Sequence, residues 1–160
     1  MALGAAMVKG TPQAFCVVPG PGILNTTAAL STAFAVNAPV LSLAGQIPSH
    51  AIGKGHGLLH EIPDQLGITK LAERIARPES ASKTIKNAFR ELTSGRPRPV
   101  GIEVPQNIWA QKSVGLDTFI SQKIEMEVDE DNLEQAALWL AEGTNPMVVV
   151  GSGAIETPIL

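Results

Sequence analysis

The 160 residues carry a formal net charge of −3 at pH 7, and this acidic balance leaves no basic surface of the kind that binds nucleic acids. Hydrophobic residues make up 44% of the chain and charged residues 17%, which indicates a globular protein with one ordinary core. The sequence shows neither an apolar run of the roughly 18 residues that span a membrane nor a signal peptide, so we expect no membrane association and a cytoplasmic location.

The first predicted element is a strand over residues 13–18, an apolar run bounded by Pro12 and Pro19. Its composition is typical of a strand that is buried in a parallel sheet. Cys16 is the single cysteine of the chain and lies inside this strand. We therefore interpret it as a buried, unreactive thiol rather than a nucleophile or a disulfide partner.

A Gly-Pro-Gly turn at residues 20–22 follows this strand. Glycine adopts backbone angles that are closed to other residues, and Pro21 lacks an N–H that the start of a helix leaves unpaired. A largely buried helix is predicted over 23–36, with Asn37 at its end. Because ligands of open α/β sheets bind at the carboxyl ends of strands, this turn and Asn25 are the first place to look for function.

Strands and helices alternate further along the chain. Strands are predicted at 39–44 and 98–104, and a helix at 82–94 is closed by Gly95. This alternation predicts an α/β fold, with a parallel sheet flanked by helices. Residues 106–128 show no clear period and are interpreted as a connecting segment.

A second α/β unit is predicted after this segment. Its helix is expected to begin at Asp131, with Glu134 completing a capping box, and a strand over 146–150 follows. The next residues, Gly-Ser-Gly-Ala at 151–154, contain half of a dinucleotide-binding fingerprint but lack its third glycine and the acidic residue further on. We therefore favour an ordinary strand-to-helix turn over a nucleotide site.

The long loop over 45–65 contains all three histidines, His50, His56 and His60, together with Glu61. Imidazole and carboxylate groups suit zinc or iron, but the glycines of this loop disfavour a helix that would hold them on one face. Polar residues at the surface or lining a pocket are the favoured interpretation, so no metal ligand is assigned. An acid/base role for His60 or Glu61 is chemically open, because histidine titrates near neutrality.

Basic side chains are frequent in the third quarter of the chain. Glutamates are interspersed among them, so a solvated surface is favoured over an anion-binding site. The basic residues concerned are Arg74, Arg77, Lys83, Lys86, Arg90, Arg96 and Arg98.

Three motifs carry a family resemblance: Gly20-Pro21-Gly22 with Asn25, the stretch 37–48 with Gln46 and Pro48, and the stretch 93–105. Their order and spacing resemble the acetolactate synthase-like thiamine diphosphate enzymes. The resemblance implies that residues 1–110 are part of a pyrimidine-binding domain, that 111–130 form a linker, and that 131–160 begin a central domain.

The resemblance also implies a mechanism and a set of contacts. In this family a glutamate promotes deprotonation of the thiazolium carbon, and the resulting ylide attacks a 2-oxo acid, so the cofactor carries the hard chemistry. The Gly20-Pro21-Gly22 turn and Asn25 would contact the pyrimidine ring. Gln46 and Pro48 would lie in a loop that faces the active site of a neighbouring subunit, so a homo-oligomer is expected.

The sequence departs from the family in several places. The family's glutamate matches a position a few residues before Met1, and the Gly-Asp-Gly motif that anchors Mg²⁺ and the diphosphate is absent. His60, followed by Glu61, stands about where many relatives carry an active-site glutamine, so it is the one candidate here for a catalytic role. Thiamine diphosphate with Mg²⁺ is expected in the full-length enzyme, and FAD, which only some relatives hold, is left open.

Two hypotheses follow. The first is a fragment of a thiamine diphosphate-dependent carboligase or decarboxylase of 2-oxo acids, inactive by itself because the activating carboxylate is missing. The second is a non-catalytic α/β interaction module that pairs with a full-length relative.

Overall fold

The computed structural model describes residues 1–55, 67–112 and 128–154. It divides the chain into two units, Met1–Ile124 and Glu125–Leu160, which are described separately below. None of the helices in the described part is long and apolar enough to cross a lipid bilayer.

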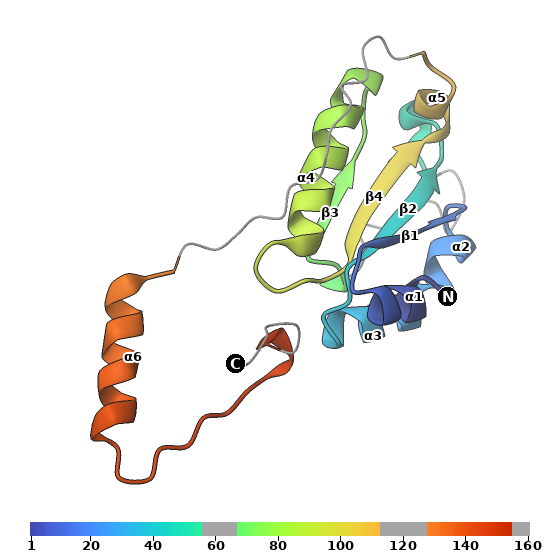
Figure 1. The fold of residues 1–160 in the computed structure, drawn as a ribbon. Helices are drawn as coiled ribbons and strands as arrows, with labels where there is room; N and C mark the ends of the chain where they lie inside the picture. Colours follow the sequence, from blue (N-terminus) through green and yellow to red (C-terminus); the bar gives the residue numbers. More distant parts are fainter. Residues whose placement is uncertain (56–66, 113–127, 155–160) are drawn as a thin grey trace. The chain divides into compact units, whose positions relative to one another are not determined.

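The first unit is built on a sheet of four parallel strands in the order β1-β2-β4-β3 (Figure 1). The predicted parallel sheet flanked by helices is confirmed, and three of its strands lie where the sequence indicated. The fourth, β3, was not predicted, because a four-residue run that mixes Leu, Ala, Glu and Arg gives no period. The strands are β1 (Gln13–Val17), β2 (Val40–Gln46), β3 (Leu71–Arg74) and β4 (Val100–Pro105).

Helices cover both faces of the sheet. The helices α1 (Ala2–Lys9) and α3 (Thr27–Ala35) pack on one face, where Ala6, Leu30 and Val40 are almost fully buried. The helix α4 (Ala81–Thr93) packs on the other face. Alternate residues of a strand point to opposite faces, so each helix layer meets its own set of strand side chains.

The larger of the two cores lies between α4 and the strands β2, β3 and β4. Leu92 of α4 and Val100 and Ile102 of β4 have no exposed surface. These side chains follow the two periods that the sequence displays, 3.6 residues along α4 and two residues along β4. This packing fixes the sheet, and the sheet in turn fixes the loops at the carboxyl ends of its strands.

The single helix predicted over 23–36 is interrupted. The chain forms a short helix α2 (Pro21–Leu24), two turn residues, and then α3. Thr26 Oγ1 donates to the carbonyl oxygen of Ile23 at 2.7 Å, and Thr27 Oγ1 donates to that of Leu24 at 2.8 Å. Threonine hydroxyls that bond nearby carbonyls compete with the helical pattern, which accounts for the break.

The predicted end of this helix is confirmed at Asn37, which has a φ of 59°. The N–H of Ala38 donates to the carbonyl oxygen of Ala33 at 2.9 Å, which closes the helix as in a Schellman motif. Asparagine is one of the few residues besides glycine that tolerate this left-handed conformation.

The prediction that the first strand is buried was wrong. β1 is the edge strand of the described sheet, and its residues are partly or fully exposed. Cys16 is exposed as well, which corrects its interpretation as a buried thiol. Apolar composition does not distinguish a central strand from an edge strand, because both pack at least one face on a core.

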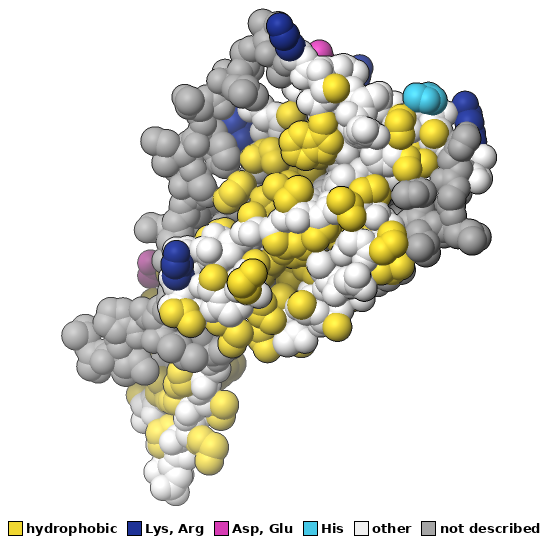
Figure 2. Space-filling view, turned by 90° about the vertical axis from the view of Figure 1, so that its right-hand side faces the viewer, with side chains coloured by type: hydrophobic (Ala, Val, Ile, Leu, Met, Phe, Trp, Pro, Cys, Tyr) yellow, Lys and Arg dark blue, Asp and Glu magenta, His cyan; other side chains and the backbone are white. Residues whose placement is uncertain are grey.

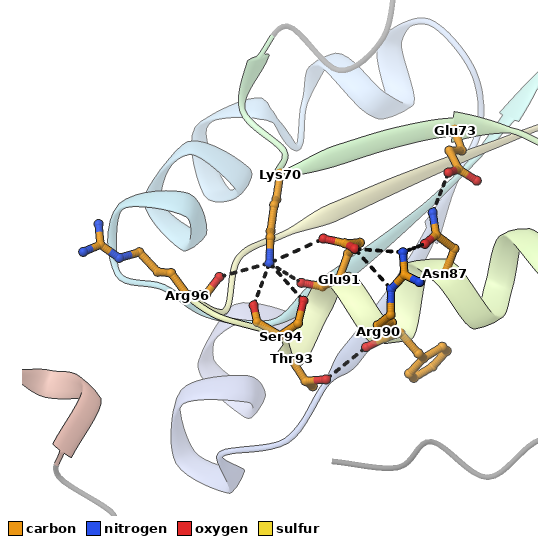
Figure 3. A network of polar contacts seen from close by, with 9 residues as sticks. Lys70, Glu73, Asn87, Arg90, Glu91, Thr93, Ser94 and Arg96 are labelled. Carbon is orange, nitrogen blue, oxygen red and sulfur yellow. Dashed lines mark hydrogen bonds and ion pairs between the residues drawn. The ribbon is translucent and has the colours of Figure 1, made fainter. Parts of the chain in front are cut away.

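Lys70, which precedes β3, closes the C-terminal end of α4 (Figure 3). Its Nζ donates to the carbonyl oxygens of Glu91 and Ser94 at 2.9 and 2.7 Å, and it lies 3.6 Å from Glu91 Oε2. The last carbonyl groups of a helix lack partners within the helix, and a cation stabilises this end of the helix dipole.

We expect Lys70→Met to lower the free energy of unfolding by about 1–2 kcal/mol, because methionine keeps the length of the side chain but leaves these carbonyls without their charged donor. Urea denaturation followed by circular dichroism measures the change. Lys83→Met, at an exposed position of α4, is the control and should change the free energy of unfolding little. Equal effects of the two substitutions would show that Lys70 does not cap α4.

The second unit contains the helix α6 (Glu130–Glu142) and a short 3-10 turn at Ser152–Ala154. The helix begins earlier than predicted, because Asp129 is its N-cap and accepts the N–H of Asn132 at 3.1 Å. The strand predicted over 146–150 is not formed: these residues belong to no sheet in the described part of the chain. A strand requires a neighbouring strand for its backbone hydrogen bonds, and hydropathy alone does not supply one.

Candidate functional site

The topology identifies one edge of the sheet as the place for a ligand. The connection from β1 to β2 passes through α3 on one face, and the connection from β3 to β4 passes through α4 on the other. The winding therefore reverses where β2 and β4 lie side by side. In open α/β sheets, ligands bind beyond the carboxyl ends of the strands at this kind of reversal.

The Gly-Pro-Gly turn lies at the carboxyl end of β1. Gly20 has φ 63° and ψ −113°, a combination that is open to glycine and costly for any residue with a Cβ. Pro21 is the first residue of α2, where its missing N–H has no consequence. Leu24 N donates to the Gly20 carbonyl oxygen and Asn25 N to that of Pro21, each at 3.0 Å. These hydrogen bonds and the glycine-specific angles of Gly20 thus hold the backbone of the turn in one conformation.

Glycines also allow this turn to pack closely against its surroundings. A Cβ added at Gly45, near the end of β2, would lie 3.2 Å from Cδ of Pro19. A Cβ added at Gly22 would lie 2.7 Å from Cγ2 of Val18. Pro19, which leads from β1 into the turn, therefore approaches β2 at a residue without a side chain, and this brings the first two sequence motifs near each other.

The end of β2 carries a buried polar side chain, Gln46, of which 5% is exposed. Its Oε1 accepts the N–H of Ile47 at 2.7 Å, and its Nε2 donates to Oε1 of Glu103 on β4. The other carboxylate oxygen of Glu103, Oε2, accepts Nε of Arg74 at 2.5 Å. Three neighbouring strands therefore contribute one linked polar group each.

The loop after β2 is attached to the segment after β4. Pro48 precedes the 3-10 turn Ser49–Ala51, and its carbonyl oxygen accepts the N–H of Ala51 at 2.8 Å. Asn107, in the short helix α5 (Gln106–Trp109), accepts the N–H of Ser49 at 2.8 Å and donates Nδ2 to its hydroxyl oxygen at 3.0 Å. This pair of bonds holds the start of the loop over the sheet edge.

A cavity of about 440 Å³ opens at this edge. It combines the end of β1, the end of β2 and the helix α5, and its lining is mostly apolar. Figure 2 shows the side of the molecule that lies to the right in Figure 1, and hydrophobic side chains are gathered on it. The lining residues are Cys16, Val17, Val18, Pro19, Gly45, Gln46, Ile47, Gln106 and Trp109.

The residues predicted for the site fall into three groups. Gly20, Pro21, Gly22 and Asn25 form the turn and α2 at the end of β1. Gln46 lines the cavity, and Pro48 begins the loop beside it. The remaining predicted residues, His60 and Glu61, lie outside the described residues, as does His56.

The metal hypothesis concerned the histidines of the same loop. His50 is described, and it is exposed in the turn after Pro48. Within residues 1–55, 67–112 and 128–154, no three side chains of His, Cys, Asp and Glu come together in a way that would hold a metal ion. The described part of the chain therefore adds no support for a metal site.

Sequence reasoning missed Glu103, Arg74, Asn107 and Trp109. One signal was available for Glu103, because it is the only charged residue within the apolar run of β4 and such a residue requires a partner. Arg74 was predicted to belong to a solvated basic surface, but its guanidinium pairs with Glu103. Asn107 and Trp109 lie in α5, where a connecting segment without a period had been predicted.

Comparison with known proteins agrees with the family resemblance of the sequence motifs. Residues 1–68 match the family described as thiamine pyrophosphate enzyme, N-terminal TPP binding domain. The chain is 33% identical over 161 residues to a probable 2-ketoarginine decarboxylase of Pseudomonas aeruginosa, covering 97% of this chain and 29% of that protein. It is 30% identical over 164 residues to the probable acetolactate synthase large subunit of Methanocaldococcus jannaschii, covering 95% of this chain and 27% of that protein.

A solved structure shows the same fold. The benzoylformate decarboxylase of Polynucleobacter necessarius matches 91% of this chain with a TM-score of 0.80, at 21% sequence identity. The match covers 28% of that protein. The chain thus spans less than a third of the length of each of these relatives.

Proposed function

Since the chain belongs to the acetolactate synthase-like thiamine pyrophosphate enzymes, we propose that residues 1–110 form the pyrimidine-side wall of their cofactor site. The observation that carries this proposal is the turn at Gly20, which holds a backbone conformation open to glycine and directly follows Pro19, the residue that approaches Gly45 near the end of β2. A flat aromatic ring can approach such a backbone closely, so the residues present fit the cofactor.

The roles of the site residues follow from this arrangement. Pro21 and Gly22 offer a flat contact to the pyrimidine, and Asn25 at the end of α2 is a side-chain contact. Gln46 and Pro48 belong to the loop that faces the substrate, with His60 and Glu61 further along it. When bound, thiamine diphosphate supplies the electron sink for cleavage beside a carbonyl, and the protein supplies binding and orientation.

The substrate class is a 2-oxo acid. The relatives include a protein named as a decarboxylase of 2-ketoarginine and proteins named as acetolactate synthases, which supports decarboxylation or carboligation of such acids. The sequence contains no Gly-Asp-Gly motif, so in this proposal Mg²⁺ and the diphosphate are held by residues other than these 160. The 160-residue chain on its own is then inactive.

The assembly is proposed on the same basis. Residues 111–130 act as a linker to a central domain that begins over 131–160, and the loop after Gln46 faces the active site of a second subunit. A homo-oligomer is the form in which the site is complete.

Titration of the isotopically labelled 160-residue chain with thiamine diphosphate and Mg²⁺ tests the proposal by nuclear magnetic resonance. We expect weak binding, on the order of millimolar because most of the site is absent, with amide shifts confined to Gly20, Gly22 and Asn25. Inorganic pyrophosphate, which lacks the pyrimidine, should not produce these shifts. Shifts elsewhere, or equal shifts with pyrophosphate, would refute the assignment of this turn to the pyrimidine.

A pair of variants separates a specific contact from a general effect. Asn25→Ala should weaken the shifts at Gly20 and Gly22, whereas Asn87→Ala, on the helix α4 that covers the other face of the sheet, should leave them unchanged. Pyruvate consumption by the 160-residue chain, or micromolar affinity for the cofactor, would contradict the proposal that the chain is inactive by itself.

A further inference from the structure

Three polar side chains form a row across the carboxyl end of the sheet. Gln46 of β2, Glu103 of β4 and Arg74 of β3 come from three adjacent strands. Arg74 pairs in register with Glu103, and Gln46 pairs with Pro105, two residues further along β4. Residues two apart share one face of a strand, so the three side chains lie on the same face.

Two members of the row are largely removed from solvent, whereas the side chain of Arg74 is 38% exposed. Gln46 is 5% exposed, and the side chain of Glu103 is 17% exposed. The two carboxylate oxygens of Glu103 have separate partners, Nε2 of Gln46 and Nε of Arg74. A buried carboxylate is costly unless it is paired and hydrogen-bonded, and Arg74 supplies the pairing charge.

This arrangement fixes which end of the Gln46 amide points to Glu103. A carboxylate only accepts hydrogen bonds, so it attracts the nitrogen of the amide and repels its carbonyl oxygen. The carbonyl oxygen is held from the other side, where it accepts the N–H of Ile47 at 2.7 Å. A flipped amide would lose both bonds and place oxygen against oxygen.

The orientation has a consequence for the cavity, because Gln46 is one of its lining residues. The amide nitrogen carries two hydrogens, of which Glu103 accepts one. The second is a donor on a nitrogen whose position is set by Glu103. A donor suits the carboxylate of a 2-oxo acid, whereas an amide oxygen in the same place would repel it.

We propose that Glu103, held by Arg74, is a positioning residue that fixes the Gln46 amide with its nitrogen as a donor for the carboxylate of the substrate. The identity of the substrate in this inference rests on the proposed function. The orientation of the Gln46 amide does not depend on it. Glu103 acts through Gln46 and does not itself contact the substrate.

The experiment observes the side-chain amide of Gln46 in the labelled 160-residue chain, with its signals assigned from their loss in Gln46→Ala. In the unmodified chain we expect two well-separated proton signals and slow exchange with solvent. Glu103→Ala should bring the two signals together and accelerate exchange by about 3- to 10-fold, the effect of losing one hydrogen bond. Glu103→Asp, which keeps a carboxylate, should restore part of the separation.

Glu79→Ala, at an exposed position, is the control and should leave both signals unchanged. Thermal unfolding of each variant shows whether it is folded, and Glu103→Asp keeps the test decisive if Glu103→Ala is not. An unchanged Gln46 amide in both Glu103 variants would overturn the proposal.

Pyruvate is then added as the probe of the substrate. We expect it to shift the Gln46 amide in the unmodified chain and, in Glu103→Ala, to do so with an affinity about 3- to 10-fold weaker. An equal pyruvate affinity in the two proteins would refute the positioning role. If pyruvate has no effect on the unmodified chain although Glu103→Ala releases the amide, the 2-oxo acid function fails and the positioning of Gln46 by Glu103 stands.

Discussion

Replacing Leu92 by alanine is expected to lower the free energy of unfolding of the first unit by about 2–5 kcal/mol. Leu92 has no exposed surface and packs among the side chains that join α4 to β2 and β4. The substitution removes buried methyl groups and leaves a cavity that the neighbouring strands can only partly close. Urea denaturation followed by far-ultraviolet circular dichroism measures the loss.

Leu138→Ala provides the matched control, because the same atoms are removed from a side chain that is 50% exposed on α6. It should change the stability of the first unit by less than about 0.5 kcal/mol. A loss from Leu92→Ala no larger than that from the control would mean that α4 does not pack on the sheet as described.

Replacing Gly20 by alanine is expected to cost about 1–3 kcal/mol of stability and to abolish the cofactor-dependent shifts at the turn. The backbone at Gly20, with φ 63° and ψ −113°, is strained for any residue that has a Cβ. The chain can relieve this strain only by changing the φ and ψ angles of the residues that lead into α2. That rotation would displace Pro21 and Gly22 from the end of β1.

Gly4→Ala is the control for this substitution. Gly4 lies inside α1, has no atom within 4 Å of an added Cβ, and is not among the residues with positive φ. Alanine favours a helix over glycine by up to about 1 kcal/mol, so Gly4→Ala should be neutral or stabilising. If Gly20→Ala were equally harmless, the described conformation of the turn would be wrong.

The two substitutions at Leu92 and Gly20 report on different levels of the structure. Leu92 tests the packing that fixes the sheet, and Gly20 tests a local conformation that depends on that sheet for its position. A protein that loses cofactor contact at Gly20 while keeping its cooperative unfolding would locate the function in the turn rather than in the general fold.

The sequence predicted well those features that depend on near neighbours. β2, β4 and α4 follow clear periods, and Asn37 is a recognisable helix end. The division of the helix after Leu24 was missed although the two threonines that cause it are adjacent in the sequence. Their hydroxyls can face solvent or bond to carbonyls, and the pattern alone does not decide between these states.

Features that depend on distant partners could not be predicted. Cys16 and the strand expected over 146–150 were both interpreted from local hydropathy. Whether an apolar strand is central, at an edge or unpaired depends on which other strands lie beside it. The row formed by Gln46, Glu103 and Arg74 likewise joins residues that are 57 and 29 positions apart.

The sequence by itself determined the family and the chemistry to look for, since the Gly-Pro-Gly turn, Gln46 and Pro48 stand in a recognisable order. Only the tertiary structure decided how they meet: it set Gly45 against Pro19 and placed Glu103 where it holds the Gln46 amide. The physical reason is that motif residues are constrained by local backbone geometry, which a short stretch encodes. A hydrogen bond between strands is decided by sheet order and register, which the whole chain sets.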